Sequence, residues 1–212
     1  SSKLGFKDSP RNTKERQCMS RILASLHMIH YFTSTMVKKF TRQILFDSSN
    51  IPKLRQLRYK KNQYIIDNEL FCSFNAKAET LSNIIKELID LPSNIERFDR
   101  SYIYYISRAK LPKIQTKELK KSVKTLLCKE KLYPIIKLIY NAGLFQTILP
   151  STKKILNQPQ FDGYHYHPVD IHSIKTLKFA QNIQNKEIKA IFDKLTNEQK
   201  IRATLEMPLM IN

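Results

Sequence analysis

The sequence predicts a mostly α-helical bundle with one small β-hairpin, followed by the first helices of a second helical unit. Apolar residues recur at spacings of three and four along most of the 212 residues, which is the period of an amphipathic helix. Only three glycines are present, too few for the tight turns of an all-β fold. With 42% hydrophobic residues, the chain can bury a sizeable core in one or two domains and is not typical of a disordered protein.

The first predicted helix runs from about residue 13 to residue 46. Apolar positions keep the helical spacing throughout it, and neither Pro nor Gly interrupts them. Residues 47–50 (Asp-Ser-Ser-Asn) and Pro52 then end the pattern. The segment exceeds an average helix, which leaves room for a break near Tyr31–Thr35.

Residues 53–74 change period and predict a β-hairpin. Tyr59 leads into Lys60-Lys61-Asn62, and Tyr64, Ile65 and Ile66 follow. Aromatic and β-branched residues on both sides of a polar turn are typical of paired strands.

Helical spacing returns after the hairpin. Pro92 ends a helix from residue 77, and Asp99 or Ser101 opens a short aromatic helix to Ala109. Thr116 opens another, and Gly143 is the expected left-handed C-cap of a helix at residues 132–141. An apolar turn at 144–150, a polar loop at 151–167, and helices at 169–183, 187–195 and 198–207 complete the prediction. A seam near residues 150–160 divides it into a helical domain at 1–150 and a second unit at 151–212.

The net charge of +19 has two interpretations. A polyanion-binding surface is one, with Lys120-Lys121 and Lys153-Lys154 on phosphate and Tyr102, Tyr104 and Tyr105 stacked on bases. Solvated helix faces are the other, because Lys outnumbers Arg 27 to 10 and nucleic-acid readers favour Arg. The Lys, Ile and Asn bias is typical of an AT-rich genome, and aromatics at helical spacing are more often core residues.

The cysteines and the hydropathy predict a cytoplasmic location without a membrane span. Cys18, Cys72 and Cys128 are scattered and odd in number, which fits a reducing compartment. No apolar run approaches the roughly 20 residues that cross a bilayer. The chain starts without Met, so we expect a piece of a longer polypeptide.

Histidines mark the best candidate site. Three of the five lie within residues 165–172, with Asp162 and Asp170 close by. Imidazole and carboxylate groups together suit a divalent metal or a general base, although loop histidines often only satisfy local backbone groups. His27 and His30 share a helix face, but no third ligand is near them in sequence, so a core or surface role is the commoner interpretation.

This segment resembles the bacterial bifunctional PII uridylyltransferase/uridylyl-removing enzymes. The resemblance covers about residues 15–210, but only 143–177 is specific. His167-Pro168 replaces a Tyr-Thr pair of the family, Ser173 replaces a Thr, and Asn68–Phe71 resembles the family's D-P-E-L-F more loosely. The matching positions are Gly143, Leu149 and Pro150, followed by Asp162, His165, Val169, Asp170, His172 and Leu177.

The resemblance implies a parent with a nucleotidyltransferase domain, a helical linking domain, an HD-type hydrolase domain and two ligand-sensing domains. This chain would be the linking domain plus the start of the HD domain, because the transferase signature and the His-Asp dyad are both absent. His172 would be the first metal ligand of the HD site, supported by His165 and Asp170.

The parent would use a divalent metal (Mg or Mn), UTP and a PII-like signalling protein, and its HD site would release UMP from the modified partner. We expect the chain alone to be inactive and to hold no tightly bound metal. The alternatives are a helical nucleic-acid-binding module that uses its basic surface, and an adaptor domain with no ligand.

Overall fold

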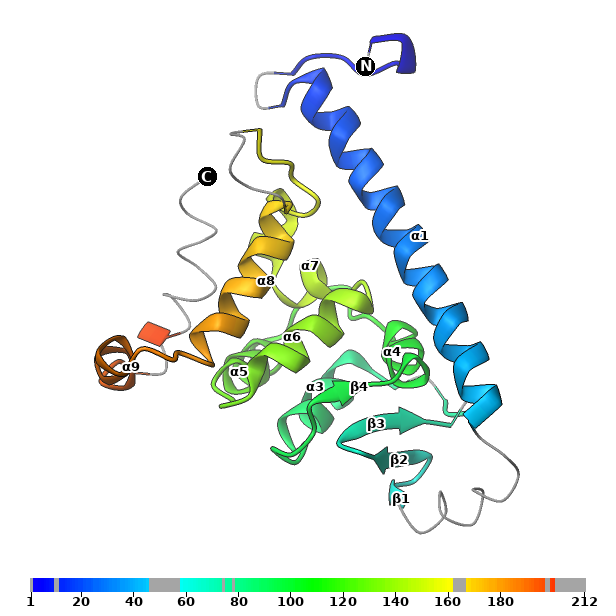
Figure 1. Ribbon diagram of the computed structural model, residues 1–212, viewed down its shortest axis with the longest axis vertical. Coiled ribbons are helices and arrows are strands. Elements are labelled where there is room, and N and C mark those ends of the chain that lie inside the picture. Colours follow the sequence, from blue (N-terminus) through cyan, green and yellow to red (C-terminus); the bar gives the residue numbers. More distant parts are fainter. Residues whose placement is uncertain are drawn as a thin grey trace.

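The computed structural model describes residues 2–9, 12–45, 58–73, 75–77, 79–161, 167–196 and 199–200, and it confirms a mostly α-helical protein with a small β element. A long helix lies along one edge of the molecule, and a small sheet lies at the lower end of the view, with the other helices mainly above it (Figure 1). None of the helices in these ranges is both long and apolar enough to cross a membrane. In chain order the elements are η1 (Ser2–Leu4), α1 (Lys14–Leu45), β1 (Arg58–Lys60), β2 (Gln63–Ile66), β3 (Glu69–Cys72), α3 (Leu81–Ile89), β4 (Arg97–Phe98), α4 (Arg100–Ser107), α5 (Lys117–Leu127), α6 (Leu132–Asn141), α7 (Phe145–Ile148), η3 (Pro150–Lys154), α8 (Val169–Ala180) and α9 (Lys186–Asp193).

The predicted hairpin is present but belongs to a larger sheet. The described strands have the order β1-β2-β3-β4, with antiparallel pairs except for the parallel β3–β4 pair. Asn62 has a positive φ in the first turn, as predicted for a hairpin. Asp67 and Asn68 both have positive φ in the second turn, so the residues after the hairpin pair as a further strand.

Local signals set the helix ends well. Asp99 Oδ1 accepts from the Ser101 N–H at 3.0 Å, so Asp99 and not Ser101 is the N-cap of α4. Thr116 Oγ1 accepts from the Leu119 N–H at 3.1 Å, which confirms Thr116 as an N-cap. Gly143 has φ +72°. Its N–H donates to the Tyr140 carbonyl, and the following N–H donates to the carbonyl of residue 139. These two bonds form a Schellman motif that ends α6.

The core joins the sheet to α3–α8. Tyr102, Leu70 and Ile136 are among its fully buried side chains, and Ile174 and Leu177 extend it into α8. Its apolar contacts are therefore continuous from β3 to α8, and they place the middle and end of α8 against the helices before it.

A partly buried carboxylate, that of Glu87, joins the sheet to two helices. Glu87 Oε1 accepts from Gln63 Nε2 at 2.6 Å and from Tyr102 Oη at 2.5 Å.

Lys129 Nζ donates to the carbonyls of Ile89 and Leu91 at 2.6 and 3.0 Å. The lysine therefore caps the C-terminus of α3, where the helix dipole favours a cation.

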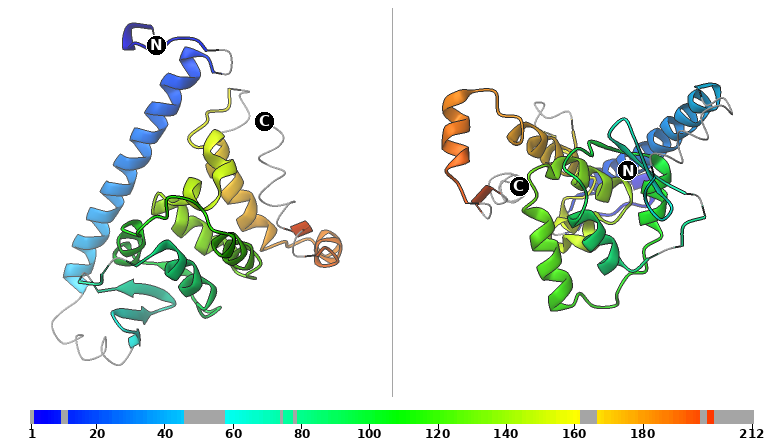
Figure 2. Two further views of the ribbon diagram at one scale, coloured as in Figure 1. Left: turned by 180° about the vertical axis from the view of Figure 1, so that it is seen from behind. Right: turned by 90° about the horizontal axis from the view of Figure 1, so that it is seen from below.

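The long helix α1 is continuous, so the break allowed near Tyr31–Thr35 is wrong. The Ser34 and Thr35 hydroxyls donate to the Tyr31 carbonyl at 3.0 and 2.7 Å, inside the helix. The Arg100 guanidinium lies 3.9 Å from the centre of the Tyr31 ring and donates to Ser34 Oγ. These contacts fix the middle of α1 against α4, whereas both ends extend beyond the body (Figure 2).

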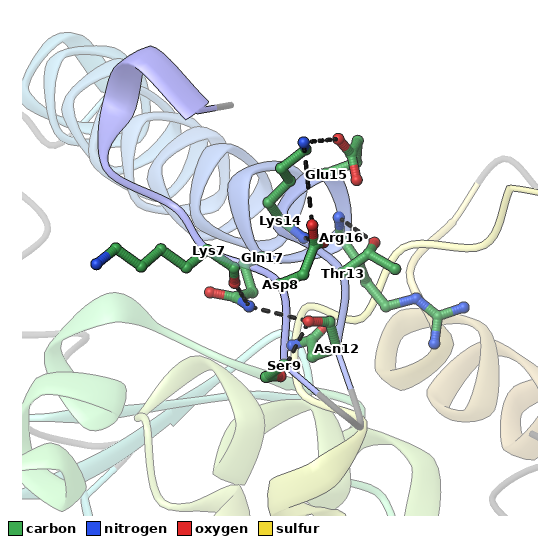
Figure 3. A network of polar contacts seen from close by, with 9 residues as sticks. All are labelled: Lys7, Asp8, Ser9, Asn12, Thr13, Lys14, Glu15, Arg16 and Gln17. Atoms are coloured by element: carbon green, nitrogen blue, oxygen red, sulfur yellow. Dashed lines mark hydrogen bonds and ion pairs between the residues drawn. The ribbon is translucent and has the colours of Figure 1, made fainter.

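The residues before α1 fold back onto its first turn (Figure 3). Asp8 Oδ1 accepts from the Lys14 N–H at 2.9 Å, and Gln17 Nε2 donates to the Lys7 carbonyl at 2.8 Å. The second bond connects residues ten apart in the sequence. It therefore holds the N-terminal segment against the side of α1, so this segment does not continue the direction of the helix.

The region after α6 is more regular than predicted. Short helices α7 and η3 occupy residues given as an apolar turn and the start of a polar loop. Thr152 and Ile155 are buried there, and the Thr152 hydroxyl donates to the Leu149 carbonyl at 2.7 Å. Burial and this bond stabilise turns that carry little signal of their own. The helix predicted at 198–207 lies largely outside the described residues.

Candidate functional site

Among the residues of the predicted site, Asp170 is held in place by three hydrogen bonds. It lies in the first turn of α8 and is completely buried. Its Oδ2 atom accepts from Tyr140 Oη at 2.9 Å and from the Asn157 N–H at 2.9 Å. Its Oδ1 atom accepts from the N–H of residue 171 at 2.9 Å. The buried carboxylate therefore joins α8 to α6 and to the loop between them.

The backbone around Asp170 explains how this arrangement forms. Pro168 is the N-cap residue of α8, and its backbone is extended, with φ −55° and ψ 155°. The positive end of the helix dipole then favours a carboxylate in the first turn. Asn157 has φ +53°, a left-handed conformation that asparagine adopts more readily than most residues. Its N–H consequently points at Asp170.

Aromatic rings connect this carboxylate to α1. The Tyr140 and His27 rings meet edge to face, with centroids 5.2 Å apart. Burial, followed by the charge and hydrogen bond of Asp170, raises the pKa of Tyr140 well above its usual value. Burial is the main effect that lowers the pKa of His27. The charge of Asp170 raises this pKa, whereas His30 and Arg100 lower it further. The structure thus assigns His27 to packing between helices.

His172 lies two residues after Asp170, so a rotation of about 200° along α8 separates the two side chains. His172 is partly buried, and its backbone N–H donates to the Pro168 carbonyl at 2.9 Å. His167 Nε2 contacts Lys175 Nζ. Burial lowers the pKa of His167, and Lys175 and His172 lower it further. His165 and Asp162 lie outside the described residues.

The donor set in the described part of the chain does not complete a metal site. Among those residues, no three His, Cys, Asp or Glu side chains are grouped so that they could hold a metal ion. His172 could supply one ligand, whereas structural and catalytic sites need at least three from the protein.

The tyrosines considered for base stacking have mainly structural positions. Tyr102 and Tyr105 are buried in the core, which excludes them from binding a base. Tyr104 is exposed, but the Arg108 guanidinium lies 4.5 Å from the centre of its ring. Lys120, Lys121, Lys153 and Lys154 are exposed, as both interpretations of the charge expect.

Sequence reasoning missed two residues of the site, Tyr140 and Asn157. Tyr140 lies three residues before the segment that most resembles the family, and nothing in its spacing shows that its hydroxyl reaches an aspartate 30 residues away. Asn157 carries no local signal except the general tolerance of asparagine for positive φ.

Comparisons with known proteins agree with the resemblance over part of the chain. A curated relative is the bifunctional uridylyltransferase/uridylyl-removing enzyme of Zymomonas mobilis, which is 30% identical over 82 residues. These residues are 37% of this chain but 9% of that enzyme. No family model matches the sequence, and no solved structure matches it. The chain is therefore similar, in part, to an enzyme of the nucleotidyltransferase type.

Proposed function

We propose that this chain is a helical scaffold within a cytoplasmic regulatory enzyme related to the PII uridylyltransferase/uridylyl-removing type. It would link a nucleotidyltransferase domain to an HD-type hydrolase domain, with the boundary near residues 150–151. The catalytic domains on either side would act on UTP and on a PII-like protein. The scaffold itself would hold the two sites apart and fix their orientation.

The observation that carries this proposal is the buried attachment of Asp170. The carboxylate holds the start of α8 to Tyr140 of α6 and to the loop at Asn157. This helix also carries His172, the residue that the family motif aligns with the first metal ligand of an HD site. A hydrolase domain that begins on α8 would consequently have a fixed position relative to the helices before it.

The role of His172 can be tested on a longer form of the protein, extended until it includes a His-Asp pair. We expect this form to retain about one Mn²⁺ per chain after dialysis, and His172→Ala to lose it, because a catalytic site keeps only three or so protein ligands. His30→Ala changes an exposed histidine on α1 and should keep the metal. Metal content measured by mass spectrometry distinguishes these results, and equal content in wild type and His172→Ala would refute the assignment.

The alternative function is a nucleic-acid-binding module, and one helix favours it. Lys117, Lys120, Lys121 and Lys124 are all exposed on α5, where Glu118 is the one acidic residue. Phosphate binding by such a face would collapse between roughly 50 and 200 mM salt. Electrophoretic shifts with RNA and DNA test this directly, and no binding at low salt would exclude the module.

A further inference from the structure

The outer side of α1 carries a row of exposed apolar side chains. We call it the apolar stripe. Its members recur mostly at intervals of three and four residues, so they share one side of the helix. His27, Tyr31 and Ser34, which contact the body, lie on the opposite side. The stripe consists of Met19, Ile22, Leu26, Ile29, Phe32 and Phe40.

The stripe is large for a surface in contact with water. Exposed fractions range from 37% for Met19 to 66% for Phe32. At about 200 Å² for a fully exposed side chain of this size, the six members leave roughly 650 Å² exposed. Monomers rarely keep patches above about 300–600 Å² without a function, and a standard interface buries about 800 Å² on each partner.

The charge of α1 indicates which kind of partner fits. From residue 16 to residue 45 the helix contains five Lys and Arg residues and no Asp or Glu. Two copies of this chain would place like-charged helices side by side, with +19 on each molecule. A partner with acidic flanks beside an apolar face would instead be attracted.

The shape of one end of the stripe favours a protein helix over a lipid surface. Leu4 and Phe6 of the N-terminal segment, with Ile22 and Leu26 of α1, line an open hollow of about 450 Å³. Arg21 lies at its edge. Hydrogen bonds hold the segment that forms this wall against the start of α1 (Figure 3). A hollow accepts a projecting side chain of a docked helix, whereas a flat bilayer would leave it unfilled.

We propose that the apolar stripe is a docking site for an acidic amphipathic helix of a partner protein. The apolar face of that helix would pack along α1, one side chain would enter the hollow beside Leu4 and Phe6, and its Asp or Glu residues would face Arg21 beside that hollow. The proposal is independent of the nucleotidyltransferase assignment, because it depends only on α1 and the segment before it.

A synthetic helix tests the proposal on the 212-residue protein. The probe is a fluorescent peptide of about 22 residues, the length of the stripe, with Leu on one face and Glu on both flanks. Fluorescence anisotropy should show saturable binding that weakens with salt. A peptide of the same composition with the Leu residues dispersed around the helix should bind at least tenfold more weakly.

Paired variants of the protein locate the binding surface. Ile22→Gln/Ile29→Gln should reduce affinity for the peptide at least tenfold, because two apolar side chains no longer contribute to burial. Ile188→Gln/Ile191→Gln changes two exposed isoleucines of α9, 56% and 65% exposed, and should leave affinity unchanged. Gln is a good helix former, and circular dichroism checks that both variants keep their helix content.

Several outcomes would overturn the proposal. Absence of peptide binding at millimolar concentration is one, and equal affinity for the stripe variant and wild type is another. Sedimentation with phosphatidylserine vesicles, abolished by the stripe variant while the peptide does not bind, would assign the stripe to a membrane. A wild-type dimer in light scattering that the stripe variant converts to a monomer would assign it to self-association.

Discussion

Replacing Asp170 with Ala is the most direct perturbation of the joint between α6 and α8. Tyr140 Oη and the Asn157 N–H both donate to this fully buried carboxylate. A hydrogen bond to a charged group contributes about 1.5–3 kcal/mol, and a carboxylate in the first turn of a helix adds about 0.3–1 kcal/mol. Without full additivity, we expect Asp170→Ala to lower the free energy of unfolding by about 3–5 kcal/mol.

Urea unfolding followed by far-UV circular dichroism measures this loss. Asp193→Ala removes an exposed carboxylate at the end of α9 and should change the stability by less than about 0.5 kcal/mol. Adding Tyr140→Phe to each background completes a double-mutant cycle, in which we expect a coupling of about 1–2 kcal/mol. If Asp170→Ala costs less than about 1 kcal/mol, or the coupling is zero, Asp170 does not hold the joint.

Three further predictions follow from buried or constrained groups. The folded-state pKa of Tyr140 is raised above the ordinary value near 10. The contribution of Tyr140 to stability is therefore complete below about pH 10 and is lost as the pH rises further. Urea unfolding midpoints above this pH should fall less steeply in Tyr140→Phe than in wild type. Burial, with Glu87 next, raises the pKa of Cys72 to about 11, so Ellman's reagent at neutral pH should modify exposed Cys128 quickly and Cys72 only on unfolding; rapid reaction of two thiols other than Cys18 would contradict this. Gly143→Ala should cost about 1–2 kcal/mol in thermal or urea unfolding, entirely from its positive φ, because an added Cβ meets nothing within 4 Å; a much larger loss would indicate a steric cause instead.

The parts of the fold that sequence predicted well are those that depend on neighbouring residues. Thr116, Asp99 and Gly143 act within three or four positions of their partners, so the sequence alone identifies them. Strand β4 contains two residues and pairs with β3 about 30 positions away. A strand this short has no periodicity of its own, and only tertiary contacts select it.

The candidate site also contains residues that a local sequence motif identifies and residues that only tertiary contacts bring together. The motif singled out His172 as a ligand and Asp170 as a residue that supports it, and in the structure the Asp170 carboxylate is buried between α8, α6 and the loop at Asn157. Its partners Tyr140 and Asn157 lie 30 and 13 residues away, beyond the reach of any local pattern. The metal role of His172 stays a prediction, because it depends on ligands that the described residues do not supply.

The central attachment of α1 has a mechanical consequence. Its contacts with the body through His27, Tyr31 and Ser34 fall within about two turns, whereas the helix is 32 residues long, or roughly 48 Å. A tilt of about 10° about this short fulcrum would move each end by about 4 Å, given the rise of 1.5 Å per residue. A small repacking beside Arg100 that tilted the helix would therefore appear as a larger displacement at its ends.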